Sequence, residues 1–150
     1  MLQIQSKALG SCEIEEKQLI RFSNGLFGFE SHTEFALLDA MQRPFYWLQS
    51  LRDIDISFLL INPYLFRSDY VLEVPDSDIE EIGAPDPDDI LVFAIVTVPE
   101  DVREMTANLQ GPVIINRRDS LGRQSIHLDP NWETRHRILG EADGKRDNAC

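Results

Sequence analysis

Three histidines, two cysteines and 26 carboxylates are the side chains of this 150-residue chain that could do chemistry. The histidines, His32, His127 and His136, show no HxxxH spacing, and Cys12 and Cys150 form no CxxC motif. Common zinc centres need such closely spaced ligands. The pattern therefore predicts no metal and no other cofactor, and it predicts two free thiols in a reducing compartment.

Catalytic motifs are equally scarce. Gly25 and Gly28 have a GxxG spacing, but the helix start and Lys partner of a phosphate-binding loop do not follow. No GxSxG sequence is present, and a neighbouring pair such as Asp88-Asp89 arises by chance among so many acids. We interpret Arg21–Glu30 as a tightly packed loop and predict that the chain is not an enzyme. An acid/base hydrolase, which would need a substrate cleft, is the alternative.

The charge of the chain is concentrated in one stretch. The formal charge is −12, and residues 69–101 hold eleven acids without one Lys, Arg or His. Such a surface repels nucleic-acid phosphates, so direct nucleic-acid binding is not expected. A basic protein partner is favoured instead, although a high negative charge also serves solubility alone.

The acid-rich stretch must be positioned by a short helix and a buried strand. Ser77 and Glu80 match a capping box, which predicts a helix of about two turns near 77–82. Asp78, Glu80 and Glu81 are expected to point outward from it. The continuous apolar run at 90–98 favours a strand covered on both faces, with a buried helix as the competing interpretation.

The rest of the chain predicts short strands separated by turns. Apolar alternation and β-branched or aromatic runs indicate them. Residues 117–122 would turn a hairpin at an edge of the sheet, and 132–139 would form either a short strand or one helical turn. The other candidates are a hairpin within 1–20 and strands near 35–38, 45–50, 57–61, 70–74, 112–116 and 124–128.

These roughly nine strands indicate an all-β fold, a small single-domain antiparallel β-barrel or alternatively a β-sandwich, with one short helix. The domain is predicted to cover residues 1–139. Residues 140–150 are polar and are predicted to be a frayed tail. No apolar run reaches the ~20 residues that cross a bilayer, and residues 1–10 lack the pattern of a signal peptide. A cytoplasmic location is therefore expected.

Several stretches, in one order over about residues 3–139, resemble the FliW family of bacterial flagellar assembly factors. Each is weak alone, and their order and spacing make the joint signal specific. They are FSNGLFGFE (22–30), PFYWLQSLRD (44–53), INPYLF (61–66) with DY (69–70), VPDSDIEEIG (74–83), VTVPED (96–101), NLQGPVIIN (108–116) and WETRH (132–136).

The resemblance implies a small, non-enzymatic β-barrel that binds flagellin in the cytosol, near the flagellin C-terminal region. It also implies binding to CsrA, the small RNA-binding translational regulator, which then no longer represses flagellin synthesis. A flagellin-only chaperone is the alternative. Arg67-Ser68 departs from the apolar or Pro-containing link expected there, so partner choice at this loop stays open. A monomer is favoured.

We predict two kinds of partner-binding residue. An acidic protein attracts a basic regulator and repels its RNA, whereas exposed ion pairs contribute only about 0.2–1 kcal/mol each. Aromatic anchors should therefore add affinity. The predicted acidic contacts are Asp78, Glu80, Glu81, Asp88 and Asp89, and the predicted exposed anchors are Tyr64, Phe66 and Tyr70.

Overall fold

The structure, a computed structural model, describes residues 1–139. Strands dominate this part of the chain, and the longer of its helices, α1, spans Asp76–Glu81. The strands are β1 (Leu2–Ser6), β2 (Gly10–Ile14), β3 (Leu19–Phe22), β4 (Glu34–Asp39), β5 (Tyr46–Ser50), β6 (Ser57–Ile61), β7 (Ile90–Thr97), β8 (Thr106–Ala107), β9 (Val113–Asn116), β10 (Leu121–Gln124) and β11 (His136–Arg137). Single 3-10 turns are η1 (Glu16–Gln18), η2 (Pro63–Leu65), η3 (Pro87–Asp89) and η4 (Val102–Glu104).

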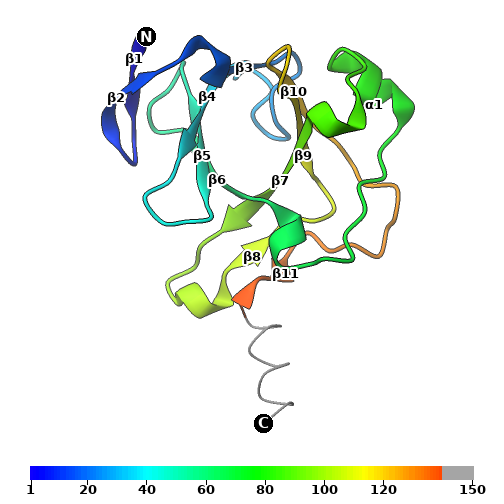
Figure 1. Cartoon of the computed structure of the whole chain (residues 1–150). Coiled ribbons are helices and arrows are strands. Elements are labelled where there is room, and N and C mark those ends of the chain that lie inside the picture. The colour runs from blue at the N-terminus through cyan, green and yellow to red at the C-terminus, as the bar shows by residue number, and fades with distance from the viewer. Residues whose placement is uncertain (140–150) are drawn as a thin grey trace.

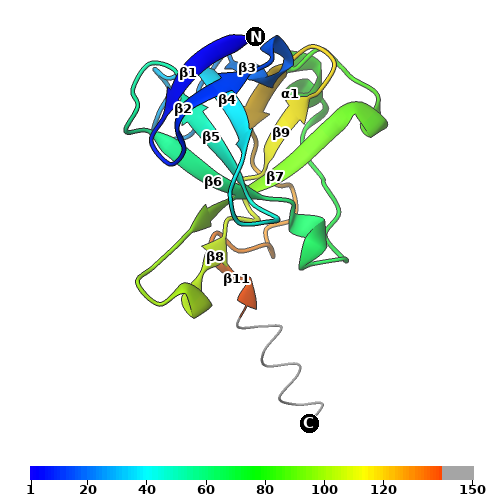
Figure 2. The same ribbon diagram turned by 60° about the vertical axis from the view of Figure 1, so that its left-hand side comes forward.

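Seven strands close into a barrel, which Figure 1 shows nearly end-on. They follow the order β7-β6-β5-β4-β3-β10-β9, and β9 pairs again with β7. The predicted barrel is thus confirmed, and the sandwich alternative falls away. One feature differs from the purely antiparallel expectation, because β10 pairs with β3 in parallel. The strands β8 and β11 extend from the end of β7 outside the barrel (Figure 2).

Large apolar side chains fill the barrel. They alternate inward along the strands, and burying each of them stabilises the fold by about 1.5–3 kcal/mol. Phe22 and Phe35 meet edge-to-face with ring centroids 5.3 Å apart. The buried members of this core are Ile20, Phe22, Leu26, Phe35, Leu48, Leu60, Phe93, Val113 and Ile115.

Two glycines let backbone and rings approach closely. Gly122 pairs with Phe22 across the parallel contact, and a Cβ there would lie 2.8 Å from the Phe22 ring. Gly25 has φ +63°, and a Cβ there would lie 2.5 Å from the Phe29 carbonyl oxygen. Only glycine fits both positions without strain. The loop around Gly25 is therefore the tightly packed loop that the sequence predicted.

Most of the predicted elements are confirmed. The β1–β2 hairpin packs its apolar side chains, Ile14 among them, on the outer face of β4, and β4 to β7 and β9 lie where expected. The segment 132–139 contains the short strand β11, so the strand alternative predicted there is the correct one. The sheet edge predicted at the hairpin turn of residues 117–122 is wrong, because β10 lies between β3 and β9. The strand predicted at 124–128 is wrong in position, because the returning strand is β10 at Leu121–Gln124 and residues 125–128 form no strand.

An outer layer covers one side of the barrel. It consists of residues 62–89 and 125–138, which pack against the outer side of β6 and β7 and against β8. The buried members of this shared cluster are Ile61, Tyr70, Ala94, Val96, Ala107, Leu109 and Ile138. The strand predicted at 70–74 is wrong, since no ladder forms there. Two isolated hydrogen bonds replace the ladder: the His127 imidazole Nε2 donates to the Val71 carbonyl at 2.6 Å, and the Leu128 amide donates to the Glu73 carbonyl at 2.8 Å. The tail predicted at 140–150 lies outside the described residues.

Candidate protein-docking surface

The acidic helix α1 is attached to the barrel by its C-terminal end. Ile82 is buried there, and its carbonyl accepts a hydrogen bond from the Asn116 side-chain amide at 2.8 Å. Gly83 and Ala84 then take positive φ values, which end the helix. The predicted capping box is wrong, because Pro75 occupies the N-cap and Ser77 already lies inside the helix.

Arg123 of β10 holds two of the predicted acidic contacts. Its guanidinium lies 3.2 Å from an Asp78 carboxylate oxygen and also pairs with Glu81. Asn24 donates a further hydrogen bond to Glu81. The Asp78 side chain is only 13% exposed, so the expectation that it points outward is wrong. Its carboxylate lies beside the arginine that neutralises it, because a charge removed from water needs such a partner.

Asp89 is also paired rather than displayed. It is 8% exposed, and its Oδ1 lies 2.9 Å from the Arg117 guanidinium. Arg118 approaches the other oxygen at 3.7 Å. Of these two predicted acidic contacts, only Asp88 is therefore exposed. The carboxylate of Asp89 instead ties η3 to the turn between β9 and β10.

Four acids around α1 and η3 form the displayed negative surface. Within residues 1–139 they have no cationic partner within 4.0 Å, and all four are exposed. They are Asp76, Glu80, Asp86 and Asp88. We call them the acidic patch. It is smaller than the sequence suggested, because three arginines fold back onto its neighbours.

The three predicted aromatic anchors differ in exposure. Tyr64 is 40% exposed, Phe66 is half-buried against the His136 ring, and Tyr70 is 2% exposed. The exposure predicted for Tyr70 is thus wrong. Its hydroxyl donates to the Leu109 carbonyl at 2.9 Å, and burial, aided by the nearby Tyr64, raises the pKa of Tyr70 far above its ordinary value. Burial also raises the pKa of Tyr64.

The Arg67-Ser68 link has a structural explanation. Arg67 pairs with Asp69 through two hydrogen bonds of 2.8 and 2.6 Å. Its guanidinium also lies over the Trp132 ring, 4.9 Å from the centroid, which is a cation–π contact. Arg67 therefore fastens the loop after η2 to the segment before β11.

A groove of about 670 Å³ lies beside Tyr64. Its walls come from the extended segment 72–74, from α1 and from the outer face of β7, and they are mainly apolar. Glu73 and Asp76 stand at its margin. The apolar lining residues are Tyr64, Leu72, Val74, Ile79, Pro87, Ile90, Val92 and Leu128.

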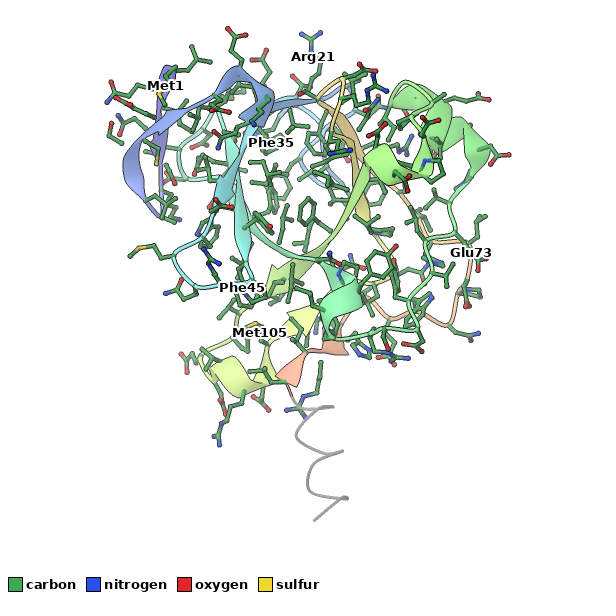
Figure 3. All side chains as sticks on the ribbon, viewed as in Figure 1. Met1, Arg21, Phe35, Phe45, Glu73 and Met105 are labelled. Atoms are coloured by element: carbon green, nitrogen blue, oxygen red, sulfur yellow. The ribbon has the colours of Figure 1, made fainter. Side chains whose placement is uncertain are left out.

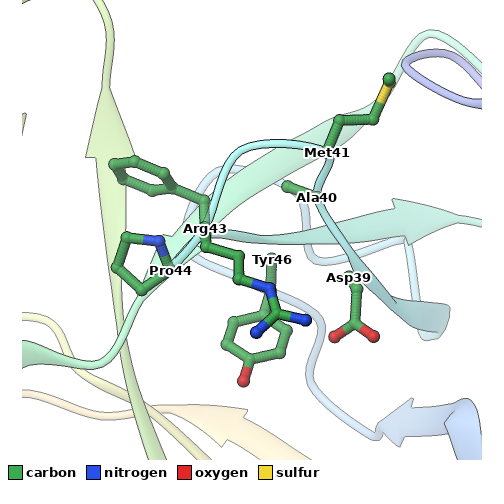
Figure 4. A pocket seen from close by; sticks show the side chains of 7 residues that line it. Asp39, Ala40, Met41, Arg43, Pro44 and Tyr46 are labelled. Carbon is green, nitrogen blue, oxygen red and sulfur yellow. The ribbon is translucent and has the colours of Figure 1, made fainter.

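A second hollow of about 620 Å³ lies at the tip of the β4–β5 hairpin. Figure 4 shows Arg43 extending beside the Tyr46 ring, with Asp39 on the same side. Met41 at this tip is 81% exposed. No buried charged side chain points into this hollow among its lining residues, and none of the predicted partner-binding residues lines it.

Other types of site were searched in the described part of the chain. No three His, Cys, Asp or Glu side chains there lie close enough to hold a metal ion. No helix within residues 1–139 has the length and apolar character to cross a membrane.

Sequence reasoning missed the residues that shape this surface. Arg117 and Arg118 were interpreted only as residues of a hairpin turn, Arg123 was given no role, and Asn116 was interpreted only as the end of a strand. One signal was available in the sequence: three arginines occur within seven residues, and another part of the chain has acids without any base. Opposite charges of that kind pair when a fold brings them together.

The molecule is thus a small closed β-barrel with an acidic patch and an apolar groove side by side on its outer surface. The chain belongs to the FliW family, since the family model described as FliW protein matches residues 3–138.

Relatives and a solved structure agree with this assignment. The chain is 44% identical to the flagellar assembly factor FliW of Treponema denticola over 140 residues, which is 93% of this chain and 95% of the relative. It is 43% identical to that of Treponema pallidum, covering 97% of each chain. A crystal structure of the flagellar assembly factor FliW matches with a TM-score of 0.85 and 34% identity, over 92% of this chain and 97% of the other.

Proposed function

We propose that this protein acts in flagellar assembly as a non-enzymatic, partner-switching regulator in the cytoplasm. It binds flagellin, and it binds a CsrA-type RNA-binding regulator and relieves that regulator's repression of flagellin synthesis. The observation that carries the flagellar role is family membership, with relatives named flagellar assembly factors at 44% and 43% identity. The two partners follow from the resemblance, and a monomer is the proposed state.

The acidic patch supports the regulator-binding part. RNA-binding proteins carry basic surfaces, so a surface with Asp76, Glu80, Asp86 and Asp88 exposed attracts them. The same charges repel the phosphates of a competing transcript. The groove beside the patch adds apolar contact area, which exposed ion pairs alone do not supply.

Isothermal titration with purified flagellin and purified CsrA-type regulator tests the proposal. We expect heat of binding with each partner, and release of a flagellin leader RNA when this protein is added to the regulator–RNA complex. Absence of both heat and co-elution with either partner would end the proposal.

Charge reversal tests the role of the acidic patch. The double substitution Glu80→Lys and Asp88→Lys changes two exposed carboxylates that have no cationic partner in the described chain. We expect weaker regulator binding and a flatter dependence on salt, because long-range attraction is screened. The matched control is Glu13→Lys with Glu16→Lys, which makes the same charge change near the β1–β2 hairpin, away from α1 (Figure 1).

The predicted contacts Asp78, Glu81 and Asp89 are proposed as supporting residues of this surface, because they are paired with arginines. Charge reversal of these three residues can be compared with the double substitution at Glu80 and Asp88, with both affinities corrected for unfolded protein. If reversal of the three weakens regulator binding more, the direct contact role predicted for them is favoured instead. Phe66 and Tyr64 remain proposed anchors, with Tyr64 the more exposed of the two.

The second candidate is a chaperone that binds flagellin only. Tyr64 and the apolar groove favour it, because a chaperone needs apolar contact area and no competition with RNA. Translation of a reporter carrying a flagellin leader discriminates the two. A flagellin-only chaperone leaves repression by the CsrA-type regulator unchanged, whereas the proposed regulator relieves it.

A further inference from the structure

The segment 71–74 behaves as a strand with only one edge occupied. On one side the Val71 carbonyl accepts from His127 Nε2 at 2.6 Å, and the Glu73 carbonyl accepts from the Leu128 amide at 2.8 Å. In an extended chain the backbone groups of successive residues face opposite edges. The groups of Leu72 and Val74 therefore face away from 127–128.

This second edge is open. Within residues 1–139, the N–H and C=O groups of Leu72 and Val74 make no hydrogen bond. The edge is short, because Pro75 has no N–H and begins the entry into α1. In Figure 1 the extended segment runs down the right of the barrel between β7 and the 127–130 segment. The open edge thus lies on the side of β7.

The apolar groove lies along this edge. Leu72 and Val74 line it together with Ile90 and Val92 of β7 and Ile79 of α1. Glu73 lies at the outer surface of the molecule (Figure 3) and stands at the margin of the groove with Asp76. Unpaired backbone groups, apolar walls and carboxylates without a cationic partner therefore meet at one place.

We propose that the protein partner of this surface docks by strand addition, placing an extended peptide segment on the open edge of residues 72–74. The inference rests on the proposed function for the identity of the partner and goes beyond it in the mode of binding. A helical segment satisfies its own backbone groups and would leave this edge unpaired, whereas an added strand pairs it.

The groove defines the chemistry of that segment. Alternate side chains of an added strand point the same way, so the side chains that face the groove are apolar and fit against Ile79, Ile90 and Val92. The flanking side chains are Lys or Arg, because Glu73, Asp76 and the acidic patch lie around the site and no base occurs in residues 69–101.

Amide exchange on the intact protein tests this directly. The probe is a synthetic heptapeptide of alternating valine and lysine, and the matched control is the same peptide with N-methyl groups at alternate residues, which keeps its charge and its side chains. In the free protein the amides of Leu72 and Val74 should exchange fast. The probe at about 1 mM should protect both, and the control should bind about tenfold more weakly.

A proline pair tests the same edge by substitution. Leu72→Pro removes a donor from the open edge, whereas Val71→Pro removes one from the occupied edge of the same segment. We expect Leu72→Pro to weaken probe binding about fivefold more than Val71→Pro, since one hydrogen bond is lost. Unfolding temperatures of both variants are measured alongside, and the amide exchange of the unsubstituted protein decides the matter if either variant unfolds.

The outcomes separate this inference from the proposed function. If the regulator or flagellin binds without protecting Leu72 and Val74, strand addition is overturned and the proposed function stands. If the probe protects both amides but neither protein binds, strand addition stands and the proposed function fails. Equal binding of the probe and its N-methylated control, or an unprotected edge at saturating probe, overturns strand addition.

Discussion

The barrel and the outer layer are stabilised by different interactions, although both have buried apolar clusters. The barrel is closed by continuous backbone ladders around large side chains such as Phe22, Phe35 and Leu48. The outer layer, residues 62–89 and 125–138, is attached to the barrel by isolated hydrogen bonds and ion pairs, several of them made by side chains, such as Asn116 with Ile82 and Arg123 with Asp78.

This difference indicates which parts of the molecule tolerate substitution of a side chain. Removing one side chain of the barrel leaves a cavity inside a closed structure, whereas removing one contact of the outer layer loosens a local segment. The docking surface lies mainly on the outer layer, which isolated contacts attach to the barrel, so partner binding and local stability are coupled there. Four substitutions, in order of decreasing effect, test the comparison.

The largest effect is expected in the barrel. Phe22→Ala removes a fully buried ring that contacts Phe35, and we expect a loss of about 3–5 kcal/mol in the free energy of unfolding. Urea unfolding followed by fluorescence measures it. Phe27→Ala is the control, because Phe27 is 49% exposed. Similar losses for the two variants would contradict the division between barrel and surface.

A smaller effect is expected where the outer layer joins the barrel. Asn116→Ala removes the hydrogen bond to Ile82 and the acceptor for the amides of Arg118 and Asp119. We expect a loss of about 2 kcal/mol in unfolding free energy, because buried partners are left unsatisfied. Amide exchange should show α1 opening before the barrel does. The exposed Asn131→Ala is the control, and uniform opening of both regions would argue against separate layers.

Tyr70→Phe should cost about 1 kcal/mol, since it deletes one buried hydrogen bond, that to Leu109, and keeps the ring. The pH dependence is more specific. Burial raises the pKa of Tyr70 above the unfolded value of about 10. The folded state therefore favours the protonated phenol, and this contribution is complete below pH 10 and is lost as pH rises above it.

Unfolding curves between about pH 8 and pH 11 measure this contribution. Tyr70→Phe should show a shallower fall in stability than the unsubstituted protein. Part of the fall remains, because burial raises the pKa of Tyr64 as well. An equally steep fall in Tyr70→Phe would show that Tyr70 does not carry the effect.

The smallest effect on stability is expected for Arg123→Gln. It removes the charge that pairs with Asp78 and Glu81 but keeps a side-chain amide that can donate to these carboxylates. We therefore expect a loss of only about 0.5–1 kcal/mol. Binding of a basic partner should instead strengthen, because two more carboxylates become available. Arg21→Gln, an exposed arginine of β3, is the control. Weaker partner binding in Arg123→Gln would mean that the position of α1, which Arg123 holds, matters more for binding than the negative charge of the helix.

Much of the fold could be predicted, because the alternation of apolar residues and the residue types of turns depend on neighbours in the sequence. The strand at 57–61 was predicted with its observed bounds, and the strands at 45–50 and 90–98 were placed within one residue of theirs. The strand predicted at 70–74 was wrong because the same local pattern cannot show whether a neighbouring strand pairs with it. Its apolar alternation is real, and burial alternates from Tyr70 to Val74, but alternation reports burial and not the presence of a neighbouring ladder.

The candidate site could be predicted only in part. Glu80, Asp88 and Tyr64 are exposed as expected, whereas Asp78, Asp89 and Tyr70 are not. A carboxylate is displayed or neutralised according to which cations the fold places beside it. The nearest arginines come from β10 and from the turn before it, 28 to 45 residues further along the chain.

The sequence by itself determined that this chain is all-β and strand-rich with an acid-only stretch, and the order of its motifs determined the family. Periodicity and composition suffice for this, because they depend on near neighbours and on totals. Tertiary structure alone decided the parallel contact of β10 with β3, the pairing of Arg123 with Asp78, the burial of Tyr70 and the open edge at Leu72 and Val74. Each of these depends on contacts between segments that are distant in the sequence, and no local sequence pattern specifies which segments come into contact.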